Sequence, residues 1–113
     1  MKSSKLLQRN VLGINKLVSH GLLSTEAAML AISIHIKVLE KNLNGEACVA
    51  IPAKTICDYL GVKSNVTAYK YIKECEAANL IHKTEHKGLA NHYGIGLDFN
   101  ADDYIDVMGA TVL

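Results

Sequence analysis

The stretch that decides the fold is residues 55–72, TICDYLGVKSNVTAYKYI. It predicts two short helices joined by a tight turn. The first helix, expected over 52–60, ends at Gly61, because glycine readily adopts the left-handed backbone conformation that closes a helix. Ser64 is a favourable N-cap for the second helix, which is expected to run to about Ala78. Two helices connected in this way form a helix-turn-helix.

The side chains of the second helix divide into an inner set and an outward set. Helical spacing places Ala68, Tyr71 and Ile72 on the inner side, and Cys57 is the small residue needed where the first helix crosses it. The outward set consists of Ser64, Asn65, Thr67, Tyr69, Lys70 and Lys73. Hydrogen-bonding and cationic side chains of these kinds read base edges and bind phosphates in the DNA major groove. The alternative is an ordinary amphipathic helix whose polar face is turned to water.

A β-hairpin is expected after the second helix. Residues 80–85 and 92–99 have the composition of strands, and a turn at 87–91 separates them. Lysines at such a hairpin tip could follow the phosphate backbone or enter a minor groove. Outside the second helix, the candidate DNA-binding residues are Lys54, Lys63, Lys83, His86, Lys87 and Asn91. The alternative for the hairpin lysines is that they only keep an exposed edge soluble.

Two segments of this region resemble a known family. Residues 51–62, IPAKTICDYLGV, and residues 72–81, IKECEAANLI, are similar to the winged helix-turn-helix DNA-binding proteins of bacteria, phages and plasmids. The resemblance covers about residues 47–99 and implies that the second helix is the recognition helix and the hairpin is the wing. It also implies double-stranded DNA as a partner. The turn at 61–64 is one residue longer than the commonest pattern of that family.

Two longer helices are expected before this region. Residues 4–19 carry apolar side chains at helical spacing, and the helix expected over 24–43 is apolar nearly all the way round. A helix of that kind in so small a domain is the centre of the core, half of a subunit interface, or both. We expect residues 4–43 to supply the dimerisation surface. Residues 47–51 predict a short strand, and 100–113 a C-terminal helix and tail.

The chain of 113 residues, half of them hydrophobic, predicts a single domain over 1–113, and the resemblance implies that this domain is a winged helix-turn-helix. The expected fold class is mainly α with a small β-wing, α+β. No apolar run reaches the roughly 20 residues that span a bilayer, and no signal peptide follows Met1. The cysteines, Cys48, Cys57 and Cys75, are an odd number without paired spacing, so we expect buried thiols in a reducing compartment. The expected location is the cytoplasm.

The net charge of +1 is unevenly distributed along the chain. Residues 1–20 carry four basic and no acidic side chains, and residues 98–113 carry four acidic and no basic ones. We expect the N-terminal lysines near the DNA and the acidic tail away from it. One module of such low charge binds DNA weakly, so we expect a homodimer with recognition helices about 34 Å apart. The alternative is a monomer in which these helices bury one another fully.

No catalytic or cofactor site can be assembled from the sequence. His82, His86 and His92 lack the Cys or acid pair that would complete a zinc site. The glycines of 94–96 lie in a strand without the helix of a dinucleotide-binding fingerprint, so they indicate close backbone packing or a bulge. His35 is expected to be a hydrogen-bonded histidine of the core or of an interface. We therefore expect no enzyme, no cofactor and no metal.

The favoured function is sequence-specific binding of double-stranded DNA as a homodimer, in the role of a transcriptional regulator. Two alternatives stay open. One is a plasmid or phage DNA-maintenance factor, which would be a centromere-binding partition adaptor with a filament-forming protein partner, or a replication protein. The other is a protein-interaction winged helix without DNA binding.

Overall fold

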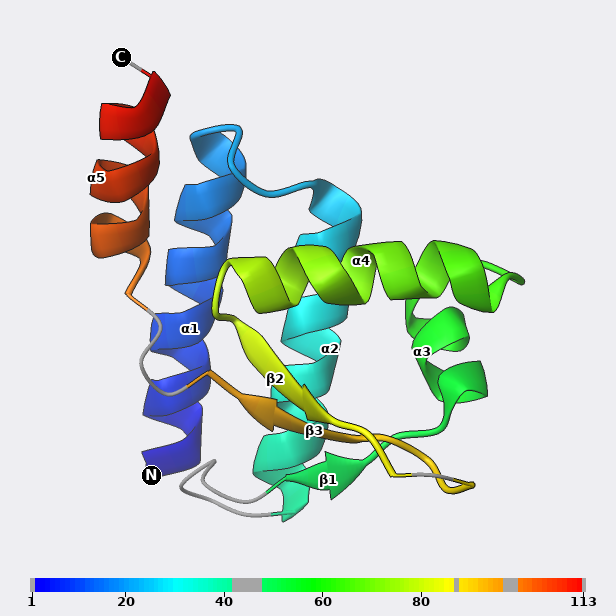
Figure 1. The fold of residues 1–113 in the computed structure, drawn as a ribbon. Helices are drawn as coiled ribbons and strands as arrows, with labels where there is room; N and C mark the ends of the chain where they lie inside the picture. The colour runs from blue at the N-terminus through cyan, green and yellow to red at the C-terminus, as the bar shows by residue number, and fades with distance from the viewer. Residues whose placement is uncertain (1, 42–47, 87, 97–99, 113) are drawn as a thin grey trace.

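The computed structural model describes residues 2–41, 48–86, 88–96 and 100–112 (Figure 1). The elements in chain order are α1 (Lys2–Ser19), α2 (Thr25–Lys41), β1 (Val49–Ala50), α3 (Ala53–Leu60), α4 (Asn65–Ala77), β2 (Ile81–Thr84), β3 (His92–Ile95) and α5 (Ala101–Val112). Among the described residues, the strands form one three-stranded antiparallel sheet. The fold is therefore mainly helical with a small sheet, and the expected α+β class and order of elements are confirmed.

The observed bounds differ from the expected ones by a few residues. Pro52 is the N-cap of α3 and not its first residue, because its backbone is extended with ψ at 151°. Strand β3 ends at Ile95, four residues before the end predicted for it. Of the expected elements, residues 42–43, 47 and 97–99 lie outside the described part of the chain.

Strand β3 is the central strand of the sheet and pairs with β1 on one side and β2 on the other. His82 lies opposite Gly94 in the β2–β3 register. A Cβ atom on Gly94 would lie 2.5 Å from the His82 ring, and one on Gly96 would overlap the backbone carbonyl of Asn79. The prediction that these glycines allow close packing is confirmed.

Helix α2 is the centre of the core. It contacts α1, α3, α4 and all three strands of the described sheet. Figure 1 shows it behind α4 and the sheet, with α1 alongside. Leu30, Ile34 and Val38 are fully buried on it. The nearly continuous apolar sequence of this helix is thus explained by neighbours on three of its sides.

The buried His35 joins α2 to two other elements. Its Nε2 donates to the carbonyl oxygen of Leu80 at 2.7 Å, and its Nδ1 accepts from Asn10 Nδ2 at 3.4 Å. Burial lowers the pKa of His35, although the hydrogen bond to Leu80 partly offsets that shift. The expectation of a hydrogen-bonded core histidine is confirmed.

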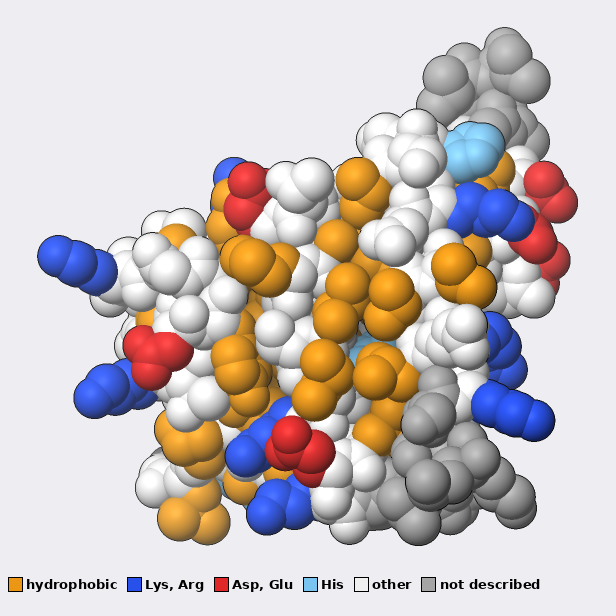
Figure 2. Space-filling model, turned by 180° about the vertical axis from the view of Figure 1, so that it is seen from behind, with side chains coloured by type: hydrophobic (Ala, Val, Ile, Leu, Met, Phe, Trp, Pro, Cys, Tyr) orange, Lys and Arg blue, Asp and Glu red, His pale blue; other side chains and the backbone are white. Residues whose placement is uncertain are grey.

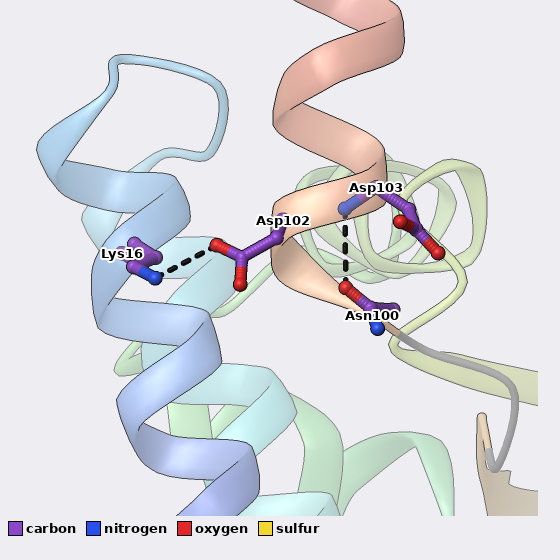
Figure 3. A network of polar contacts seen from close by, with 4 residues as sticks. All are labelled: Lys16, Asn100, Asp102 and Asp103. Carbon is purple, nitrogen blue, oxygen red and sulfur yellow. Dashed lines mark hydrogen bonds and ion pairs between the residues drawn. The ribbon is translucent and has the colours of Figure 1, made fainter.

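Helices α1 and α5 lie side by side, so the basic N-terminal segment and the acidic tail are neighbours. Lys16 Nζ lies 2.7 Å from Asp102 Oδ1, in the first turn of α5 (Figure 3). Asn100 Oδ1 accepts from the backbone N–H of Asp103 at 3.1 Å and begins that helix as expected. Lys16 of the basic N-terminal segment therefore pairs with an acidic residue of the tail, because α5 folds back onto α1.

The cysteines also differ from expectation in one case. Cys57 and Cys75 are buried, as predicted, but Cys48 is exposed beside β1. Cys75 donates to the carbonyl oxygen of Ala27 at 3.2 Å, and burial raises the pKa of its thiol to about 12. None of the helices in the described residues is long and apolar enough to cross a membrane.

Candidate nucleic-acid interface

Helices α3 and α4 are joined by a four-residue turn that the local sequence dictates. Gly61 has φ at 67°, and the Val62 N–H donates to the carbonyl oxygen of Cys57 at 3.0 Å, which closes α3. Ser64 Oγ accepts from the Val66 N–H at 3.2 Å and caps α4. Both the glycine stop and the serine cap were predicted from the sequence.

The packing of α4 follows the predicted division into two sides. Ala68, Ile72 and Cys75 are buried and Tyr71 is half-buried. The predicted outward residues Ser64, Asn65, Tyr69, Lys70 and Lys73 are exposed, and Thr67 is half-buried. The outward set is therefore confirmed for all of its members except Thr67, which is partly covered.

The helix pair holds Asn65 in a defined orientation. The Cys57 thiol of α3 donates to Asn65 Oδ1 at 3.3 Å. Because the oxygen takes this bond, the amide NH₂ group is available to a ligand. The small residue at the helix crossing thus also orients a polar side chain at the start of α4.

The exposed charges of the helix pair are mainly positive. Over residues 53–77, all of them described, the exposed charged side chains are four lysines and one carboxylate. The lysines are Lys54, Lys63, Lys70 and Lys73, and the carboxylate is Asp58. Glu74 and Glu76 are half-buried; Glu74 contacts Ser24, and Glu76 lies near Lys83 and Tyr93. This surface suits an anionic ligand although the net charge of the chain is close to zero.

Lys83 lies between α4 and the hairpin, and its side chain is only 5% exposed. Its Nζ is 4.2 Å from the centre of the Tyr69 ring and 3.3 Å from Glu85 Oε1. Burial lowers the pKa of Lys83, but hydrogen bonds with Tyr69 and Glu85 outweigh that effect and raise it overall. Lys73 Nζ also lies near this ring, 4.8 Å from its centre. Lys83 therefore couples α4 to β2, whereas Lys73 is exposed.

The connection between β2 and β3 presents further side chains to solvent. His86 is exposed and its ring centre lies 4.2 Å from that of His92. Gly88 has φ at 76°, and Leu89 is 73% exposed. Lys87, which was also predicted to be at the hairpin tip, lies outside the described residues.

These elements form one continuous surface. Figure 1 shows the start of α4 and the β2–β3 connection on the same side of the molecule, with α3 between them. A small pocket of about 100 Å³ lies between α3, α4 and β3. Asn65, Tyr69 and the half-buried Asn91 are among the residues that line it. The structure thus brings together predicted site residues that are up to 26 positions apart.

Two exposed apolar side chains on this surface were missed by the sequence analysis. Val66, in the first turn of α4, is 82% exposed, and Leu89 lies in the β2–β3 connection. Val66 stands between Asn65 and Thr67, so its position among the outward polar residues was a signal that could have identified it. Leu89 had no such signal, since an apolar residue in a turn can equally cover the core.

The described residues contain no group of three or more His, Cys, Asp or Glu side chains that could hold a metal ion. The nearest approach to a reactive pair is Cys48 Sγ, which lies 3.8 Å from His82 Nδ1. Most polar groups on the surface around α4 are amides, hydroxyls, lysines and a tyrosine, which bind ligands by hydrogen bonds and charge. Comparison of the chain with protein-family models, curated proteins and solved structures found no match in any of the three.

Proposed function

We propose that this chain binds double-stranded DNA sequence-specifically, as a homodimer, through a winged helix-turn-helix. In this proposal α4 is the recognition helix and the β2–β3 hairpin is the wing. The observation that supports it is that the start of α4 and the β2–β3 connection lie on the same side of the molecule (Figure 1), and that the polar residues at the start of α4 are mostly exposed. An α-helix fits the major groove of B-DNA, and a hairpin on the same side can reach the adjoining backbone.

The side chains of α4 divide between reading bases and binding phosphates. Asn65 and Thr67, in the first turn, are placed to contact base edges, because recognition helices enter the groove by their N-terminal residues. The Val66 side chain offers an apolar contact for a thymine methyl group. Lys70 and Lys73 lie further along the exposed side and are assigned to phosphates.

The other candidate residues take supporting places around α4. Lys54 and Lys63, which are exposed on α3 and the turn, are assigned to phosphates on either side of the groove. His86, Lys87 and Asn91 belong to the wing. Lys83 is assigned to holding Tyr69 against the hairpin, because its buried amine already has partners in Tyr69 and Glu85.

Transcriptional regulation is the use that we propose for this binding, since it is the commonest role of the fold. The test is the salt dependence of binding to DNA from the chain's own genomic neighbourhood, compared with random DNA of equal length. We expect tight, saturable and steeply salt-dependent binding to one local palindrome. Little binding to either DNA at physiological salt would overturn the proposal and point to a protein ligand for the same surface.

The same titration separates a regulator from a DNA-maintenance factor. A regulator saturates at one dimer on one operator. A partition adaptor or replication protein instead loads several dimers cooperatively on an array of repeats. Stoichiometry on a fragment with one site and on a fragment with several sites decides between the two.

A further inference from the structure

Helix α2 has one side that the described part of the chain leaves partly exposed. Met29 and Ile36 are 45% and 40% exposed there, and Ile32 and Ser33 between them are half-buried. Ile32 and Ser33 are adjacent, and each lies three or four positions from both Met29 and Ile36, so the four residues share one face of the helix. We call them the outer stripe of α2. Figure 2 shows apolar side chains gathered in a broad band down the middle of this rear face.

A groove runs beside the outer stripe. It has a volume of about 320 Å³ and lies between α2 and α3, where Ser33, Ile36, Glu40 and Tyr59 line it. A line of protruding side chains next to a groove is the shape that a second helix packs against, ridge into groove. The surface therefore suits a helical partner.

The charges around the outer stripe identify which helix fits. Glu26 is exposed in the first turn of α2, whereas Lys37 and Lys41 lie towards its last turns. In an antiparallel pair of α2 helices, Glu26 of each copy comes close to Lys37 and Lys41 of the other. Glu40 then lies near the first turn of the other α2, where the helix dipole favours a carboxylate. A parallel pair would instead set like charges against each other.

The apolar residues match in the same arrangement. When the antiparallel pair is centred between Ile32 and Ser33, Met29 packs against Ile36 of the second copy, and Ile32 packs against Ser33. Each contact occurs twice, as a twofold interface requires. Both the apolar line and the flanking charges are thus complementary to a second copy of themselves.

We propose that the outer stripe of α2 pairs with the same stripe of a second copy, antiparallel, and forms the homodimer interface. What this interface implies for DNA binding rests on the proposed function. Helix α4 and the sheet cover the opposite side of α2, so they stay free in the dimer (Figure 1). The twofold axis of this dimer lies in the interface and is perpendicular to both α2 helices. Rotation about it keeps the two hairpins on the same side of the dimer, as binding to a single duplex requires.

The interface is tested without DNA, by sedimentation equilibrium of the full chain. We expect the wild type to be a dimer, and Ile36→Glu and Met29→Glu to raise the dimer dissociation constant at least about tenfold. Leu12→Glu is the matched control, because Leu12 is 63% exposed on α1, outside the stripe, and this variant should dimerise like the wild type. Circular dichroism would show that each variant is folded. A monomeric wild type, or equal dimerisation of all variants, would overturn the proposal.

The direction of pairing is tested by disulfide formation in a Cys48→Ser background. The double variant Met29→Cys/Ile36→Cys should form covalent dimers under mild oxidation, while each single variant should not. Efficient cross-linking of a single variant would contradict the antiparallel arrangement. Because neither experiment contains DNA, a dimer that ignores DNA contradicts only the proposed function. A monomer that binds DNA through α4 contradicts this interface and the homodimer of the proposed function, but not the role of α4 in binding DNA.

Discussion

Glu74 on α4 accepts two hydrogen bonds from Ser24, the residue immediately before α2. Its Oε2 lies 2.7 Å from the Ser24 backbone nitrogen and its Oε1 lies 2.9 Å from Ser24 Oγ. Ser24 Oγ in turn accepts from the Ala27 N–H at 3.1 Å. The carboxylate therefore lies at the N-terminal end of α2, where the helix dipole is positive, and it holds α4 against this core helix. The orientation of the outward side of α4 depends on this contact.

Replacing Glu74 by Gln should destabilise the fold. The substitution keeps the shape but removes the charge that strengthens both hydrogen bonds, so we expect a loss of roughly 1–3 kcal/mol in the free energy of unfolding. Urea denaturation followed by circular dichroism measures it. Asp106→Asn on the exposed side of α5 is the control and should stay within about 0.5 kcal/mol of the wild type. Equal stability of the two variants would show that Glu74 does not hold α4 in place.

The stability of the protein should fall in mild acid because of His35. Burial lowers the pKa of this histidine in the folded state, while in the unfolded chain it stays near 6.5. Between the two values the unfolded state binds more protons, so stability is complete above about pH 6.5 and falls as the pH drops below it. The slope from this one group cannot exceed about 1.4 kcal/mol per pH unit.

The measurement is the free energy of unfolding at several pH values between 4.5 and 8. His35→Gln should be less stable at neutral pH and should lose less stability in acid than the wild type does. His20→Gln, which alters an exposed histidine of the same chain, should leave the pH profile unchanged. A wild-type profile that is flat below pH 6.5 would contradict the assignment.

The lysines and the polar residues of α4 should affect DNA binding in different ways. Lys70→Ala and Lys73→Ala should weaken binding to all sequences and reduce the slope of log K against log salt by about one each. Asn65→Ala and Thr67→Ala should instead reduce the preference for the best site by about 1–3 kcal/mol. Lys5→Ala removes the same charge from α1 and should alter neither quantity. Unchanged binding in all four α4 variants would rule out α4 as the recognition helix.

The thiols should differ sharply in reactivity. Cys48 is exposed, whereas Cys57 and Cys75 are buried, and the pKa of Cys75 is raised to about 12. We expect one thiol to react quickly with an aromatic disulfide reagent in the native protein and all three to react in denaturant. Cys48→Ser should abolish the fast phase. Fast reaction of two or three native thiols would contradict the burial of the cysteines on α3 and α4.

The element order was predictable because its signals are local. Gly61 and Ser64 act through their own backbone and the next turn of helix, and the structure shows both in the predicted roles. The division of α4 into two sides followed from helical periodicity for the same reason. Thr67 is the one exception, because it is partly covered. This coverage depends on the exact packing of α4 and not on the spacing of residues along the helix.

Contacts between distant segments could not be predicted from the sequence. Lys16 and Asp102 are 86 positions apart, and nothing near either residue indicates that α5 folds back onto α1. Nothing near Lys83 in the sequence indicates that its amine contacts the Tyr69 ring, fourteen positions earlier on another element. Cys48 is exposed just before the edge strand β1, and the sheet order cannot be read from a two-residue strand.

Nuclear magnetic resonance tests directly whether the surface formed by α4 and the hairpin binds duplex DNA. ¹⁵N-labelled protein of 12.3 kDa would be titrated with a duplex at physiological salt, and the backbone amide shifts would be mapped onto the fold. We expect the largest shift changes in the first half of α4, in the turn before it and in the β2–β3 connection. Absence of any change, or changes confined to α1 and α5, would contradict the proposed function.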